Sequence, residues 1–183
     1  MNYNQLIKNW HSQAADEDFF SKFIFEYLAF IAFLKKKEFT HATSDRMAVQ
    51  YLKRDEQYKN EYLREIQRNI ELQGSWEAIR IELSRAPLGN ASGNEEVQDI
   101  VWWNCSQIHL DDQTEEDRNK IKGVIYDWND WENMVEFWCS IRNNLFHATK
   151  NPRDARDQLL VEYGYKTLRP LVEVLLNTKS HIS

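Results

Sequence analysis

The sequence has few cysteines, glycines and prolines, and these shortages limit the kinds of protein it can encode. The two cysteines, Cys105 and Cys139, cannot build a disulfide framework or a four-thiolate zinc site, so we expect reduced thiols. Only five glycines and three prolines occur in 183 residues, whereas Leu, Ile, Glu, Lys, Arg and Gln are common. This balance favours helix over sheet, and the sequence predicts an all-α fold.

Membrane-type hydrophobic runs are also missing. The most apolar stretch, Phe19 to Leu34, carries Ser21, Lys22 and Glu26 and is short for a bilayer span. The stretch from Met1 to Asp18 is polar, which predicts no secretory signal peptide. We therefore expect a soluble, cytoplasmic protein that does not partner with a membrane.

The length and composition favour one domain that covers residues 1–183. Hydrophobic residues make up 42% of the chain and aromatic residues 13%, enough for a substantial core. Pro87 to Asn94 is the clearest loop and holds two of the five glycines. A domain boundary there would leave two small helical units, so a long connection inside one domain is the favoured interpretation.

Apolar residues recur at helical spacing along most of the chain. We predict a helix from about Asp16 to about Lys37, a short helix capped within Thr43–Asp45 and ending at Leu52, and a longer helix from Asp55 that is punctuated at Gly74-Ser75. Val97, Ile100, Val101 and Cys105 suggest a further helical stripe, and Thr114 to Asp117 resembles a helix start.

Two helices are predicted in the last third of the chain. One begins at Asp130 and carries apolar residues as far as Leu145. The last begins at Pro152, which suits a first turn, and Pro170 is expected to kink or split it.

The formal net charge is −6, but its distribution matters more than its sum. The stretch from Glu95 to Asp117 holds eight carboxylates and no Lys or Arg. The stretch from Arg142 to Arg169 holds six basic residues and three acidic ones. An anionic ligand is therefore expected to approach the second region.

Arg142, Asn143 and His147 lie at the end of the predicted helix from Asp130. On a continuous helix Asn143 and His147 share one face, and the long side chain of Arg142 can reach the same patch. Arginine suits a phosphate, and histidine can exchange a proton near neutral pH. His147 would move a proton to or from RNA, Arg142 would offset phosphate charge, and Asn143 would orient His147 or donate to the phosphate.

No metal is needed if a ribose 2′-hydroxyl is the nucleophile, so the substrate of such a site must be RNA. We expect neither a cofactor nor a metal. Lys150, Arg153 and Arg156 follow the site and are further candidates for holding the RNA backbone.

The stretch Arg142-Asn143-Asn144-Leu145-Phe146-His147 resembles the R-x4-6-H motif of the HEPN superfamily, in its common form R-N-x-x-x-H. The aromatic-rich helix near Phe23 to Leu34 is also similar to the opening helix of many such domains. The resemblance implies a HEPN-like helical bundle with additional helices and a metal-independent endoribonuclease. It also implies a homodimer in which two motifs share one cleft. The resemblance further implies a role as a toxin or as a phage-defence or stress effector. An antitoxin or regulatory protein would then be a partner.

Other interpretations stay open. The protein is alternatively a non-catalytic nucleotide-binding, RNA-binding or protein-interaction module. Another alternative is a structural domain whose acidic 95–117 face docks a basic protein. Arg142 and His147 are then ordinary helix-end side chains.

Several smaller features are better explained by structure than by function. Cys105 and His109, near Asp111 and Asp112, are a weak zinc candidate. Clustered aromatic side chains are expected to fill the core or a subunit interface: Trp102, Trp103, Trp128, Trp131, Trp138, Tyr163 and Tyr165. Three histidines are expected to be solvated: His11, His41 and His181.

Overall fold

The computed structural model describes residues 3–13, 18–90, 101–102, 123–147 and 150–178. The regular secondary structure in these ranges is helical apart from two strands of two residues each, which confirms the predicted all-α class. The helices are α1 (Tyr3–Gln13), α2 (Phe19–Phe33), a π-helical turn η1 (Leu34–Glu38), α3 (Asp45–Arg54), α4 (Glu56–Arg68), α5 (Ile70–Arg85), α7 (Trp131–Phe146) and α8 (Ala155–Thr178). The strands β1 (Gly89–Asn90) and β2 (Val101–Trp102) pair antiparallel.

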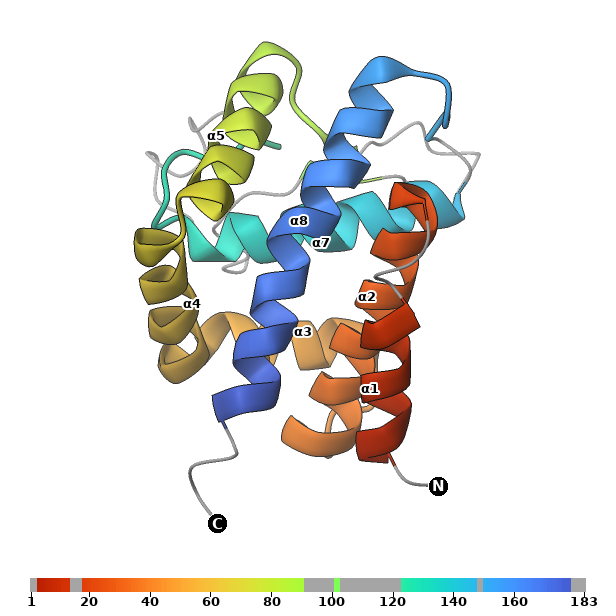
Figure 1. Cartoon of the computed structure of the whole chain (residues 1–183), viewed down its shortest axis with the longest axis vertical. Helices are drawn as coiled ribbons and strands as arrows, with labels where there is room; N and C mark the ends of the chain where they lie inside the picture. Colours follow the sequence, from red (N-terminus) through yellow and green to blue (C-terminus); the bar gives the residue numbers. More distant parts are fainter. Residues whose placement is uncertain (1–2, 14–17, 91–100, 103–122, 148–149, 179–183) are drawn as a thin grey trace.

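Helix α8 is the centre of the arrangement (Figure 1). It packs against α2, α4, α5 and α7, so elements that precede and follow residues 87–94 in the sequence meet on it. In Figure 1, α1 and α2 lie on one side of α8, α4 and α5 lie on the other, and α7 crosses behind it. Gly164 lets α8 approach α2 closely, because a Cβ atom there would lie 3.2 Å from the ring of Phe23.

The first helix, α1, was not predicted from its polar sequence. Ile7 is nevertheless fully buried, and the Trp10 ring stacks on Phe25 with centroids 5.5 Å apart. A few apolar residues on one face are sufficient for a helix that docks on a neighbour, because tertiary packing supplies most helical stability.

Side-chain caps set several helix boundaries. Ser44 caps α3 by accepting from the Met47 N–H at 3.1 Å, as predicted. The break predicted at Gly74-Ser75 is wrong. It falls at Asn69, whose extended backbone ends α4 and whose side chain accepts from the Leu72 N–H to start α5. Gly74 lies inside α5, where nothing crowds its Cα.

The last helix also differs from its prediction. It begins at Ala155 rather than Pro152, because Asp154 accepts from the Asp157 N–H at 2.9 Å in the manner of an N-cap. Pro170 does not split it, since α8 runs from Ala155 to Thr178 without interruption. Val101 and Trp102 form β2 instead of part of a helical stripe. The remainder of that stripe and the start predicted at 114–117 lie outside the described residues, as do Cys105, His109, Trp103 and His181.

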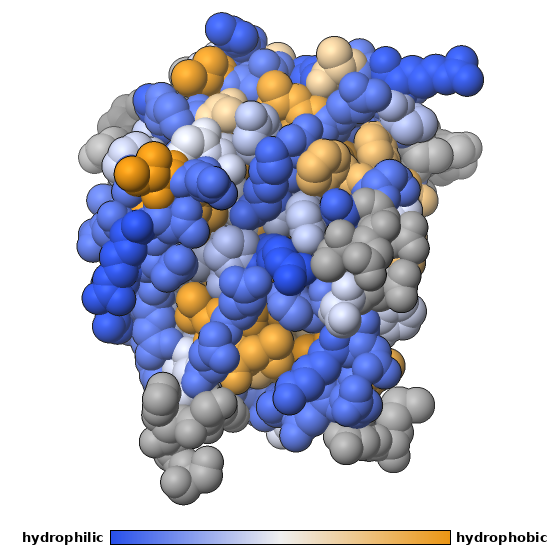
Figure 2. Space-filling model, viewed as in Figure 1, coloured by the Kyte–Doolittle hydropathy of each residue, from blue (hydrophilic) through white to orange (hydrophobic). Residues whose placement is uncertain are grey.

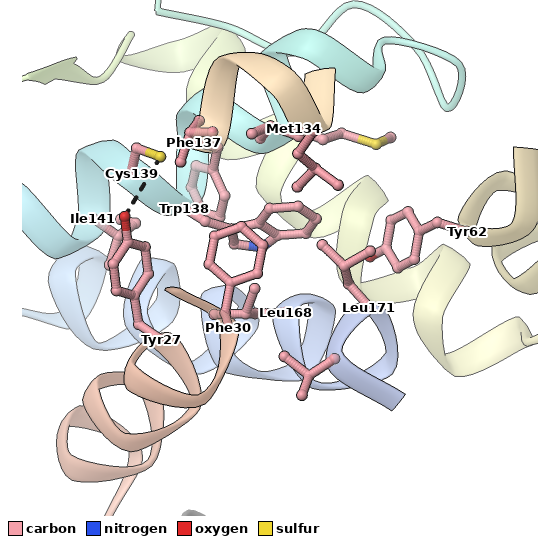
Figure 3. Packing of buried hydrophobic residues seen from close by; sticks show 14 of the residues in the cluster. Tyr27, Phe30, Tyr62, Met134, Phe137, Trp138, Cys139, Ile141, Leu168 and Leu171 are labelled. Atoms are coloured by element: carbon pink, nitrogen blue, oxygen red, sulfur yellow. Dashed lines mark hydrogen bonds between the residues drawn. The ribbon is translucent and has the colours of Figure 1, made fainter. Parts of the chain in front are cut away.

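A hydrogen-bonded cluster joins four helices in the core, and Figure 3 shows two of its rings, Trp138 and Tyr62. The Trp138 indole of α7 donates to the Thr167 hydroxyl of α8 at 2.9 Å. Tyr62 of α4 donates to the Thr167 carbonyl at 2.6 Å and accepts from the Trp76 indole of α5 at 3.0 Å. All four side chains are buried, so these bonds fix which faces of the helices meet.

Three of the tryptophans expected in the core or at an interface have described side chains: Trp128, Trp131 and Trp138. Trp131 and Trp138 fill the core, as predicted, and their rings contact each other and Tyr62. Trp128 is instead exposed, in the segment that precedes α7.

The face of the molecule that carries α8 is mainly hydrophilic, with apolar side chains in separate patches (Figure 2). Within the described ranges, no helix combines the length and apolar character needed to cross a bilayer.

Thr167→Val is expected to lower the free energy of unfolding by about 1–3 kcal/mol, because the buried Trp138 indole N–H loses its acceptor while the volume is kept. Urea denaturation measures the change. Thr43→Val, at an exposed threonine, serves as the matched control and should change stability by less than about 0.5 kcal/mol. Equal effects of the two substitutions would contradict the importance of the Trp138–Thr167 bond.

Candidate functional site

Polar contacts hold α7 in place at both ends. Near its start, the buried Glu136 carboxylate accepts from Arg46 at 2.7 and 2.9 Å and from buried Lys53, both in α3. Near its end, the buried Asn144 amide donates to the Gly89 carbonyl at 2.9 Å. These contacts and the Trp138–Thr167 bond leave α7 little freedom to rotate, so the side chains of its last turn have a defined direction.

One stripe of α7 passes from the core to the solvent. Trp138, Arg142 and Phe146 follow one another at four-residue spacing, and their exposure rises along the stripe. Trp138 is fully buried, Arg142 is half-buried and Phe146 is 60% exposed. The guanidinium of Arg142 therefore lies where α7 leaves the core.

Arg142 is held by rings and by an amide. Its guanidinium carbon lies 5.9 Å from the ring centre of Tyr27 in α2 and 4.7 Å from that of Phe146, both within cation–π range. Its Nη1 donates to Asn143 Oδ1 at 2.8 Å, which brings together two of the three predicted site residues. An amide does not cancel the charge of the guanidinium, so that charge remains available to an anion.

His147 is the C-cap residue of α7, one turn beyond Asn143. Its backbone N–H donates to the Asn143 carbonyl at 2.9 Å, which keeps this residue in the last turn. The side chain is exposed. The imidazole therefore borders the same end of the helix as the Arg142–Asn143 pair.

Two of the three basic candidates after His147, Lys150 and Arg156, are paired with carboxylates of the chain. Lys150 contacts Asp157 at 2.5 Å with a side chain only 5% exposed, and the Arg156 Nε contacts Glu82 at 2.9 Å. Arg156 also donates to the carbonyl of Ala86. Arg153 is exposed, and its N–H donates to the side chain of Asn151 at 2.9 Å. Of these three candidates for holding an RNA backbone, Arg153 is best placed, and all three remain predictions.

A second polar cluster lies between α1, α2 and α8. His11, expected to be solvated, places its Nδ1 2.6 Å from the fully buried Glu26 carboxylate. Arg169 lies 3.7 Å from the same carboxylate and 3.3 Å from Glu173. Burial raises the pKa of Glu26, and the neighbouring His11 and Arg169 oppose that shift. This cluster joins α1 to the bundle, which explains why the prediction for His11 was wrong. His41 is exposed, as expected.

Grooves elsewhere on the molecule carry mixed charge. One of about 490 Å³ lies between α4 and α8, and its lining includes Glu61, Glu65, Arg64 and Arg68. Acids and bases alternate there. At the end of α7, by contrast, the Arg142 guanidinium has no carboxylate partner among the residues that the structure describes.

Three residues that shape the candidate site were missed by the sequence interpretation. Phe146 is exposed at the site, whereas Leu145 before it packs against the core. Tyr27 underlies Arg142 from a distant helix, and Asn144 anchors the helix end. The position of Asn144 inside the R-N-x-x-x-H stretch was the one available signal. No sequence pattern links Tyr27 to Arg142.

The chain was compared with protein-family models, with curated proteins and with solved structures, and none of the three comparisons finds a match. Membership of the HEPN superfamily therefore stays a prediction that rests on residues 142–147 and their helical context.

Cys139 is expected to be unreactive, although it lies one turn before Asn143. Burial raises the pKa of its thiol to about 11, and Tyr27 donates to its sulfur at 3.7 Å (Figure 3). Near pH 8 the thiolate fraction should be about 100 times lower than for an ordinary cysteine. We expect iodoacetamide, followed by mass spectrometry in a Cys105→Ser background, to label Cys139 only after unfolding.

The control for this labelling carries Ser84→Cys and Cys139→Ser as well, which puts the thiol at an exposed position of α5. It should react readily in the folded protein. Rapid labelling of Cys139 in the folded state would show that this part of α7 opens to solvent.

Proposed function

We propose that the end of α7 is the active site of a metal-independent endoribonuclease of the HEPN type. The observation that carries the proposal is the pairing of Arg142 with an amide, whereas Lys150 and Arg156 pair with carboxylates. Among the described residues no carboxylate pairs with the Arg142 guanidinium, which is half-buried. Such a guanidinium is suited to a phosphate, because its planar donors match the phosphate oxygens. The exposed His147 is the C-cap residue at the same end of α7.

The reaction needs only groups that the site and RNA supply. The ribose 2′-oxygen attacks the adjacent phosphorus and loses its proton to a base. The bond from phosphorus to the 5′-oxygen breaks, and that oxygen takes a proton from an acid. The products carry a 2′,3′-cyclic phosphate and a 5′-hydroxyl. Arg142 offsets the negative charge that grows on the non-bridging oxygens, and Asn143 helps to hold Arg142 in place.

The reaction requires both an acid and a base, whereas one chain supplies one histidine at this site. We therefore propose a homodimer in which two copies of the site face each other and contribute one His147 each. The resemblance to HEPN supports this arrangement, and it supports a role as a toxin or defence effector in the cytoplasm that an antitoxin or other protein regulates.

A non-catalytic RNA-binding or nucleotide-binding module is the second candidate. The ion pairs of Lys150 and Arg156 favour it, because they leave fewer cations to hold a long RNA for cleavage. Such a module would use Arg142 and Asn143 to bind phosphate and would not need proton transfer by His147.

Purified protein is expected to cut single-stranded RNA in excess EDTA and to leave 2′,3′-cyclic phosphate ends. His147→Ala should lower the cleavage rate by about 10²–10⁴-fold, since it removes the proton-transfer group. His41→Ala, at another exposed histidine, is the matched control and should cleave like the wild type. Gel analysis of end-labelled RNA measures both rates.

RNA with a 2′-O-methyl group at the cleaved position should resist the wild type, because its nucleophile is blocked. Cutting of that RNA, or full activity in a verified His147→Ala preparation, would contradict the proposed chemistry. RNA binding without cleavage would favour the non-catalytic module.

Cleavage per protomer is expected to fall when the protein is diluted below the dissociation constant of the dimer, because each site needs two chains. Sedimentation velocity over the same concentrations measures the dimer. Constant activity from a monomer would overturn the shared site and leave a single-chain mechanism.

A further inference from the structure

Phe146 is the one phenylalanine of nine that lies outside the hydrophobic core. The other eight are buried in the core or packed against it. Phe146 is 60% exposed at the last position of α7, although burying such a side chain is worth roughly 1.5–3 kcal/mol. Apart from its contact with Arg142, the ring has no packing role in the described chain.

The ring lies beside the groups proposed to act on the phosphate. Its centre is 4.7 Å from the Arg142 guanidinium carbon, and it precedes His147 directly in the chain. A phosphate bound to Arg142 would carry its attached nucleosides to this same end of α7. An exposed ring at that distance is placed to meet one of their bases.

We propose that Phe146 is a positioning residue on which the base next to the cleaved phosphate stacks. This inference rests on the proposed ribonuclease function and specifies its substrate as single-stranded RNA. In a duplex the bases are paired and stacked on one another, whereas a base in a single strand is free to lie on an aromatic side chain. Base–aromatic stacking contributes about 1–3 kcal/mol per base and tolerates any base, so Phe146 gives strand selectivity rather than sequence selectivity.

The substitutions Phe146→Leu and Phe146→Trp separate stacking from simple apolar contact. Leucine keeps an apolar side chain without an aromatic face, and tryptophan keeps the aromatic face. Phe146→Leu is expected to raise KM for a single-stranded RNA by about 5- to 150-fold, the equivalent of one stacked base, with a smaller change in kcat. Phe146→Trp should restore KM. Ile70→Ala, at the most exposed apolar residue of the described chain, should leave both constants unchanged.

A second measurement reads stacking without cleavage. A 2′-O-methyl RNA that contains 2-aminopurine beside the blocked position should lose fluorescence on binding wild-type protein, His147→Ala and Phe146→Trp. The loss should be much smaller with Phe146→Leu at equal saturation. Cleavage of a base-paired hairpin should be slow with the wild type, and the advantage of single-stranded over paired RNA should shrink with Phe146→Leu.

The outcomes separate this inference from the function on which it rests. Wild-type protein that quenches 2-aminopurine but does not cleave RNA overturns the nuclease and keeps the stacking role. Wild-type cleavage that Phe146→Leu leaves unchanged overturns the stacking role alone. A loss confined to kcat would make Phe146 a support for Arg142, and loss of the dimer in sedimentation would make it an interface residue. Either result overturns the stacking role, and wild-type protein that neither binds nor cuts RNA overturns both proposals.

Discussion

The hydrogen bond from Trp138 to Thr167 is the contact on which the rest of this structure depends. It joins α7 to α8 inside a cluster that also contains Tyr62 and Trp76, and so connects four helices in a buried, water-poor region. Because a buried donor without an acceptor is costly, α7 has one favourable rotation about its own axis. With Trp138 fixed in the core, the same stripe reaches the solvent at Phe146, where α7 leaves the core.

The same end of α7 is held in place by contacts that do not neutralise the charge of the Arg142 guanidinium. Asn144 is buried and holds the helix to β1, whereas its neighbours Arg142 and Asn143 are half-buried and bonded to each other. The net negative charge of the whole chain therefore does not predict whether this end of α7 binds an anion. Local pairing decides which cations can meet a phosphate: Arg142 lies against an amide and two rings, but Lys150 and Arg156 are compensated by carboxylates.

Local sequence predicted the elements whose signals are local. The apolar spacing located α2, α3 and most of α7, and the Ser44 cap and the helical class were confirmed. Features that depend on distant partners were not predictable. Helix α1 exists because Ile7 and Trp10 dock on α2, and His11 is drawn to buried Glu26. Likewise, the pairing of Arg156 with Glu82 and the exposure of Phe146 require knowledge of the folded chain.

The central claim is that the Arg142 guanidinium and the His147 imidazole meet one phosphate. Nuclear magnetic resonance of isotope-labelled protein tests it most directly. The Arg142 side-chain nitrogen signals and the His147 ring signals, assigned with Arg142→Ala and His147→Ala, are followed during titration with an uncleavable 2′-O-methyl RNA dinucleotide. We expect both sets of signals to shift with the same dissociation constant. Binding that moves only one of the two groups, or neither, would contradict the claim.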